Sequence, residues 1–119
     1  MYPWVKDAAG NVLEFIARHN LKNKAAGNFD GSQILNVSEI GLPSEDVVAL
    51  ANDLCSTLKL TVFKQEPNAT FTPVGDDLGL FILPIKDRIW IPNSGVPAKL
   101  LPIKVKCEIN GEQWEVHGM

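Results

Sequence analysis

The sequence contains little cysteine, no long apolar run and no excess of basic residues. Its two cysteines, Cys55 and Cys107, form no CxxC pair and have no metal-ligand spacing. We interpret them as the buried free thiols of a cytoplasmic protein, with a disulfide or a reactive thiol as the alternative. The apolar runs are short and broken by Pro, Lys or Gly, so we expect no membrane partner. The first residues also lack the basic start and apolar stretch of a signal peptide.

Charge and apolar content together indicate a globular protein that does not bind nucleic acid. The formal net charge is −3 and the sequence pI is about 5.3, whereas a nucleic-acid-binding surface is expected to be basic. Apolar residues make up 45% of the chain and charged residues 21%, which is typical of a folded domain rather than a disordered one. A chain of 119 residues can form one domain with a core but is too short for two ordinary domains.

The N-terminal part is predicted to be a hairpin followed by a linker. Residues 5–17 alternate as two strands around a turn that contains glycine. Glu14 lies in the second strand between apolar neighbours, so it is either a solvated residue or one placed for function. Residues 18–33 are polar and rich in Asn, Gly and Lys, which is typical of a loop. We therefore assign residues 1–20 to a hairpin and residues 21–33 to a linker between structural units.

One amphipathic helix is predicted in the middle of the chain, after a strand at 34–42. Ser44 is the predicted N-cap, with Glu45 and Asp46 in the first turn, where the helix dipole favours acidic side chains. Apolar residues then recur at helical spacing over about four turns, and this stripe is expected to pack on a sheet. The stripe consists of Val47, Leu50, Ala51, Leu54 and Leu58.

The remainder of the chain is predicted to be mostly strands. The expected elements are a strand at 60–65, two strands within 69–85 split at 75–77, an irregular excursion at 87–95, and strands at 100–109 and 112–118. The last two strands form a hairpin, since Asn110–Gly111 is a strong signal for a two-residue turn. One helix against a mostly antiparallel sheet gives an α+β fold, with a βαβββ order in residues 34–119 before the final hairpin.

The two predicted hairpins share a spaced pattern. Both read acid-x-x-Gly-x-x-x-Glu, and an asparagine stands beside each glycine. The matched positions are Asp7, Gly10 and Glu14 in the first hairpin and Glu108, Gly111 and Glu115 in the second. One supersecondary unit used twice would account for the match, with only the final hairpin of the first copy present. Chance is the alternative, because these residue types are common.

The first hairpin resembles the end of a module in the vicinal oxygen chelate superfamily, which includes glyoxalases, bleomycin-resistance proteins and extradiol dioxygenases. Such modules commonly end in aromatic-x-x-Asp-Pro-x-Gly-Asn-x-apolar-Glu-apolar. The positions that fit are Trp4, Asp7, Gly10, Asn11, Leu13 and Glu14, with Ala8 in place of the usual proline. The βαβββ order of residues 34–119 is also that of a module in this family. The resemblance implies that the chain is the C-terminal portion of a longer two-module protein.

The start of the second module resembles the family frame His-apolar-x-apolar-x-Val-x-Asp with several departures. Ile40, Leu42 and Asp46 fit this frame. Glu39 stands at the histidine position and Ser44 at the valine position. In the last hairpin, Glu108 replaces the usual aspartate.

The resemblance implies a candidate metal site made of carboxylates. In the family, His and Glu side chains on the first and last strands of the modules hold one divalent ion, which chelates two neighbouring substrate oxygens. The corresponding residues here are Glu14, Glu39 and Glu115. His117 lies two residues after Glu115, on the same strand face, and is a substitute ligand. The metals considered are Mn, Mg, Zn, Ni and Fe, and an all-oxygen set favours hard ions such as Mg, Mn or Ca.

Three functional hypotheses follow from the resemblance, and no catalytic residue is assigned. The first is a divalent-metal-dependent lyase, isomerase or oxygenase acting on a small molecule with vicinal oxygens. The second is a non-catalytic module that binds a small-molecule ligand, as bleomycin-resistance proteins do. The third is an inactive fragment that self-associates as a homodimer or a domain-swapped assembly, because half of a two-module site leaves edges and apolar faces uncovered.

Overall fold

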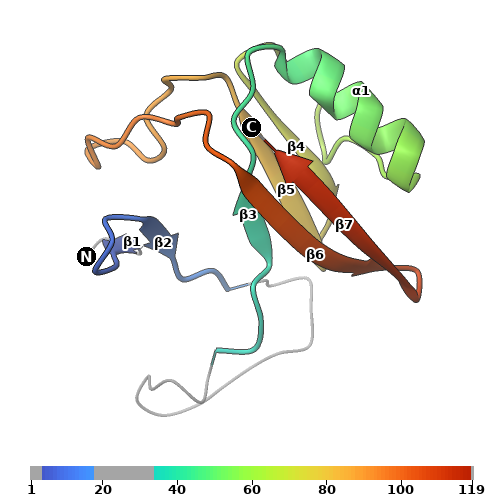
Figure 1. Cartoon of the computed structure of the whole chain (residues 1–119), viewed down its shortest axis with the longest axis horizontal. Coiled ribbons are helices and arrows are strands. Elements are labelled where there is room, and N and C mark those ends of the chain that lie inside the picture. Colours follow the sequence, from blue (N-terminus) through green and yellow to red (C-terminus); the bar gives the residue numbers. More distant parts are fainter. Residues whose placement is uncertain (1–3, 18–33, 119) are drawn as a thin grey trace.

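The computed structural model describes residues 4–17 and 34–118 of the chain. Residues 18–33, which include the predicted linker, lie outside the described part. Within it the fold is α+β, with one helix and mostly antiparallel strand pairs, as the sequence predicts (Figure 1). No described helix is long and apolar enough to cross a membrane.

The central sheet has three strands in the order β3-β5-β4. β4 (Phe71–Asp76) and β5 (Gly79–Pro84) form an antiparallel hairpin, and β3 (Glu39–Gly41) runs parallel to β5 on its other side. The hairpin turns at 77–78, next to Gly75. A Cβ at Gly75 would lie 2.2 Å from the carbonyl oxygen of Gly79, and its φ is 131°, so only glycine fits there.

The helix α1 spans Val47–Leu58 and begins two residues later than predicted. Asp46, not Ser44, is the N-cap, because its side-chain oxygen accepts the Ala49 N–H at 3.1 Å. The Ser44 hydroxyl instead accepts the Asp46 N–H at 3.0 Å and so tightens the turn that leads into the cap. The first turn of the helix holds no acidic residue. Lys59 ends the helix in the left-handed conformation, at φ 57°.

The predicted apolar stripe of α1 is confirmed as part of the core. Val47, Ala51, Leu54 and Leu58 are buried, and Leu50 is half-buried. They belong to one cluster with the buried sheet residues Val74, Phe81 and Leu83 and with Leu42, which follows β3. Complete burial of aliphatic side chains of this size stabilises a fold by about 1.5–3 kcal/mol each, so this cluster is the main source of stability.

A second, long hairpin completes the core. β6 (Ile103–Ile109) and β7 (Glu112–Gly118) pair along their whole length, and in Figure 1 they cross in front of the sheet. Their inward residues pack against the cluster that α1 covers; these are Ile103, Val105, Cys107, Ile109, Trp114 and Val116. The predicted two-residue turn is confirmed: Asn110 and Gly111 have φ of 52° and 82°, as a type I′ turn requires.

The strand predicted at 60–65 does not form. Only an isolated bridge joins Val62 to Val74, although the Phe63 N–H donates to Pro73 O and the Gly75 N–H to Thr61 O. Pro73 faces this edge of β4 and has no N–H to return, so the ladder stops there. The strand predicted at 34–42 is likewise limited to β3, since β5 begins at Gly79 and its first residue paired with β3 is Leu80, opposite Glu39.

The excursion after β5 is irregular, as predicted, and folds back on itself. Its two arms are joined by the N–H of Asp87 donating to Ala98 O and the N–H of Ala98 donating to Arg88 O, both at 2.7 Å. The Trp90 indole lies directly over Gly41 of β3, where a Cβ would come within 2.4 Å of the ring. The excursion therefore covers part of the central sheet.

The N-terminal hairpin is smaller than predicted. β1 (Trp4–Lys6) and β2 (Val12–Glu14) each have three residues. Asp7 organises the turn: one of its carboxylate oxygens accepts the N–H groups of Ala9 and Asn11, and the other accepts the Asn11 side-chain amide. These hydrogen bonds, led by the Asn11 side chain, hold the pKa of Asp7 below its usual value.

Candidate functional site

The outward face of the β6–β7 hairpin carries a row of polar side chains. Strand alternation places the apolar residues against the core, so the intervening residues face solvent. These are Lys104, Lys106 and Glu108 on β6 and Gln113, Glu115 and His117 on β7, all of them exposed. The register sets Lys104 opposite His117 and Lys106 opposite Glu115, so one of these two pairs joins unlike charges.

Glu115 is the centre of this row. Its carboxylate oxygen Oε1 lies 2.7 Å from His117 Nε2 and 4.0 Å from Lys104 Nζ. Glu115 and His117 are two residues apart on one strand, so their side chains share a face, as the sequence predicts. The three side chains are each about half-exposed, at 44%, 64% and 56% for Glu115, His117 and Lys104. We call Lys104, Glu115 and His117 the outer triad.

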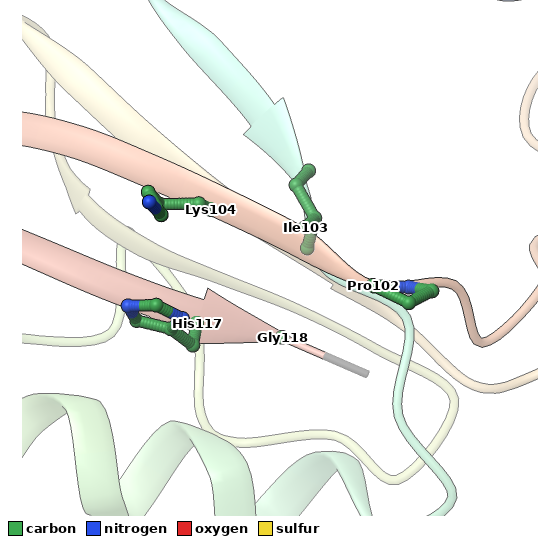
Figure 2. Close-up of a pocket in the computed structure, with 5 residues that line it drawn as sticks. All are labelled: Pro102, Ile103, Lys104, His117 and Gly118. Atoms are coloured by element: carbon green, nitrogen blue, oxygen red, sulfur yellow. The ribbon is translucent and has the colours of Figure 1, made fainter.

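An open pocket of about 320 Å³ adjoins the outer triad. Pro102, Ile103, Lys104, His117 and Gly118 line it, and Figure 2 shows Lys104 and His117 side by side on neighbouring strands at its polar end. At Gly118 a Cβ would lie 2.8 Å from Ile103 Cγ2 and 3.1 Å from Leu42 Cδ2, so this position leaves no room for a side chain on the core side. The pocket lining thus combines Pro102, Ile103 and Gly118 with a side-chain amine and an imidazole.

A second open pocket, of about 270 Å³, lies further along the same hairpin. Lys106, Gln113, Trp114 and Glu115 line it. Glu115 therefore takes part in both the second pocket and the outer triad beside the first. Amine, imidazole, amide and carboxylate groups within one strand pair can together bind an oxygen-rich small molecule.

The structure brings only part of the predicted metal set together. Glu14 is exposed at the end of β2, opposite Trp4, and Glu39 is half-buried at the start of β3, opposite Leu80. Glu115 lies on β7 in contact with His117. In residues 4–17 and 34–118, no three or more His, Cys, Asp or Glu side chains are grouped to hold a metal ion. Of the predicted ligands, the two in contact are Glu115 and the substitute ligand His117.

Lys104 is the site residue that the sequence-based metal set does not contain. The signal for it is present in the sequence. A two-residue Asn110–Gly111 turn makes Ile109 and Glu112 the closing pair, and counting back along both strands sets Lys104 opposite His117. The register of a hairpin with a known turn type therefore predicts that Lys104 and His117 lie opposite each other.

The two hairpins that share the acid-Gly-Glu pattern differ by one residue in register. Gly10 and Gly111 both have positive φ, 86° and 82°. The Asp7 N–H donates to Asn11 O, which closes a three-residue loop, whereas the second hairpin has a two-residue loop. As a result Glu14 lies opposite Trp4, but Glu115 lies opposite Lys106, one position away from the equivalent partner.

Both cysteines are free and partly shielded from solvent. Burial raises the pKa of the Cys55 thiol and of the Cys107 thiol above their ordinary value. A raised pKa keeps a thiol protonated and weakly nucleophilic at neutral pH. Both side chains pack against the core cluster, which agrees with a packing role.

Comparison with known proteins adds no relative. No family model matches the chain, and no curated protein and no solved structure matches it either.

Proposed function

We propose that this chain is a small-molecule-binding module of the kind found in bleomycin-resistance and glyoxalase proteins. The observation that supports the proposal is the outer triad beside the pocket at Ile103 and Gly118. In this proposal Lys104 and His117 donate to two adjacent oxygens of the ligand, and its carbon skeleton contacts the lining residues Pro102 and Gly118. Glu115 holds the imidazole in position through the 2.7 Å contact.

The proposed setting is the cytoplasm, where reduced thiols such as Cys55 and Cys107 are the ordinary state. The proposed fold is the βαβββ module of the same family, with the N-terminal hairpin belonging to a preceding module. The order of β3 and α1, followed by the antiparallel pairs β4–β5 and β6–β7, supports this proposal.

Catechol and resorcinol are matched probes for the binding proposal, because only catechol carries its two oxygens on adjacent carbons. We expect catechol to perturb the NMR signals of Lys104 and His117 and resorcinol to perturb them much less. Lys104→Ala and His117→Ala should each weaken catechol binding, while Lys6→Ala, an exposed lysine on β1, should not. Equal binding of the two diols, or unchanged binding by both variants, would refute the proposal.

The second candidate is a divalent-metal-dependent lyase, isomerase or oxygenase, and the Glu115–His117 contact favours it. A carboxylate and an imidazole are two common metal ligands, with Glu14 and Glu39 as the remaining predicted ones. Calorimetric titration with Mn²⁺, Zn²⁺, Ni²⁺, Fe²⁺ and Mg²⁺ tests this candidate. Glu115→Gln and His117→Ala should abolish the heat of binding, and Glu108→Gln on the same face should preserve it. If none of these ions binds, the metal-dependent candidate is excluded for this chain.

A further inference from the structure

Asn110 is the one asparagine of the chain that is followed by glycine. It lies at the tip of the β6–β7 hairpin, and both Asn110 and Gly111 are exposed to solvent. Gly111 has no Cβ to shield its backbone nitrogen, so that nitrogen can approach the Asn110 side-chain amide carbon closely. The sequence and the fold therefore place the most reactive asparagine type at an accessible turn.

We propose that Asn110 is a site of spontaneous deamidation that alters the outer triad. The Gly111 backbone nitrogen attacks Asn110 Cγ and forms a C–N bond. The side-chain amide nitrogen leaves as ammonia and takes up the Gly111 amide proton. Water then opens the resulting succinimide at either carbonyl and gives aspartate or isoaspartate at position 110. The reaction consumes one water and releases one ammonia, with no change of oxidation state.

The attack requires the turn to open, and the hairpin is built so that its tip can open. β6 and β7 form a two-stranded sheet by themselves, and such a hairpin depends on side-chain packing for its stability. That packing weakens at the tip, where the residue opposite the half-buried Ile109 is the exposed Glu112 and not an apolar residue. Local opening at a solvated turn needs far less free energy than global unfolding.

Isoaspartate changes the backbone and aspartate does not. Isoaspartate routes the main chain through the former side chain and adds one backbone carbon to a turn with only two loop residues. The type I′ geometry that pairs Ile109 with Glu112 is then lost, and with it the register that sets Lys104 opposite His117. We expect the isoaspartate form to bind catechol more weakly than the intact chain.

Incubation of the full chain at mildly alkaline pH, followed by tryptic peptide mapping, tests the reaction. The peptide 107–119 contains Asn110 and no other asparagine, while peptides 65–86 and 89–99 each contain one reference asparagine, Asn68 and Asn93. Acid forms should accumulate at Asn110 several-fold faster than at either reference. Conversion at Asn110 that is no faster than at Asn93 would overturn the proposal.

The matched control is Asn110→Gly. A Gly-Gly pair adopts the same type I′ turn and cannot form a succinimide. This variant should keep the hairpin and show no conversion in peptide 107–119. The structural consequence is tested by separating the isoaspartate form and measuring amide hydrogen exchange. Faster exchange in β6 and β7 of that form alone supports the loss of register, and unchanged protection contradicts it.

Discussion

Single glycines decide where the backbone of this protein can come close to itself. Gly75 is the strongest case, because it combines φ of 131° with a virtual Cβ 2.2 Å from the Gly79 carbonyl oxygen. Gly95 has a positive φ of 70° but nothing within 4 Å of its virtual Cβ. A comparison of substitutions at Gly75 and Gly95 therefore separates the cost of a steric clash from the cost of backbone strain.

Gly75→Ala is expected to destabilise the protein by about 3 kcal/mol or more, since a clash with backbone cannot be relieved by a side-chain rotation. Gly95→Ala is the control and should lower the free energy of unfolding by only about 1–2 kcal/mol, the strain of a left-handed residue. Urea denaturation of both variants measures the difference. Equal losses would mean that the β4–β5 turn can move away from the added methyl group.

Asp7 gives the N-terminal hairpin a pH dependence with a definite sign. Its pKa is lowered from 3.8, first by the Asn11 side-chain amide, so the folded turn favours the charged carboxylate. The stabilisation is complete above the unfolded pKa and is lost as the pH falls through the lower folded pKa. NMR titration should therefore show the hairpin signals changing below pH 3.8. Asn11→Ala should move the Asp7 midpoint upward, and an unchanged midpoint would contradict this cause.

Elements of this protein begin and end through short polar contacts that sequence patterns describe only approximately. The region Pro43–Asp46 contains two residues that are both good helix caps, Ser44 and Asp46. The choice between them depends on where the backbone leaves the bridge between Ser44 and Ile85 at the edge of the sheet. That bridge keeps Ser44 extended and moves the cap to Asp46.

Asp46→Ala should destabilise the protein by about 1 kcal/mol, because the Ala49 N–H loses its acceptor at the helix start. Ser44→Ala should have a smaller effect, since the Ser44 hydroxyl supports the preceding turn and not the helix itself. Glu45→Ala, an exposed neighbour, is the control. Thermal unfolding ranks the stabilities of the three variants. A larger loss of stability for Ser44→Ala than for Asp46→Ala would support Ser44 as the N-cap.

The molecule as a whole distributes its exposed apolar side chains unevenly. Among the described residues, most of the exposed large hydrophobic side chains precede β3; these are Val5, Leu13, Phe15, Ile16, Ile34, Leu35 and Val37. β3 pairs with β5 on one side only, and β1 pairs with β2 alone. A small hairpin with exposed apolar residues is marginally stable by itself, and open strand edges favour pairing with another chain.

A homodimer or a domain-swapped assembly through the N-terminal hairpin is therefore the proposed state of the isolated chain. Leu13→Lys combined with Phe15→Lys should shift the chain toward the monomer, because both side chains are about half-exposed at 47% and 49%. Light scattering over a range of concentrations measures the shift. Leu101→Lys, an exposed leucine outside this region, is the control. If the unsubstituted chain is already a monomer, the proposed assembly is wrong.

The sequence alone determined the features that depend on local chemistry. The spacing of Val47, Ala51, Leu54 and Leu58 predicts both the helix and its buried face. Apolar residues at helical spacing lie on one face of the helix, and that face packs on the core. Asn110–Gly111 predicts the turn and, through the turn, the register of β6 and β7. The shared face of Glu115 and His117 follows from strand alternation alone.

The tertiary structure decided the features that depend on a partner distant in the sequence. The segment at 60–65 has the composition of a strand, but Pro73 on the neighbouring strand lacks the N–H that would continue the ladder. The helix cap moved because Ser44 is bridged to Ile85. Glu14, Glu39 and Glu115 can be matched to a motif one by one, but whether their oxygens meet depends on how three separate strand pairs pack, which no local pattern specifies.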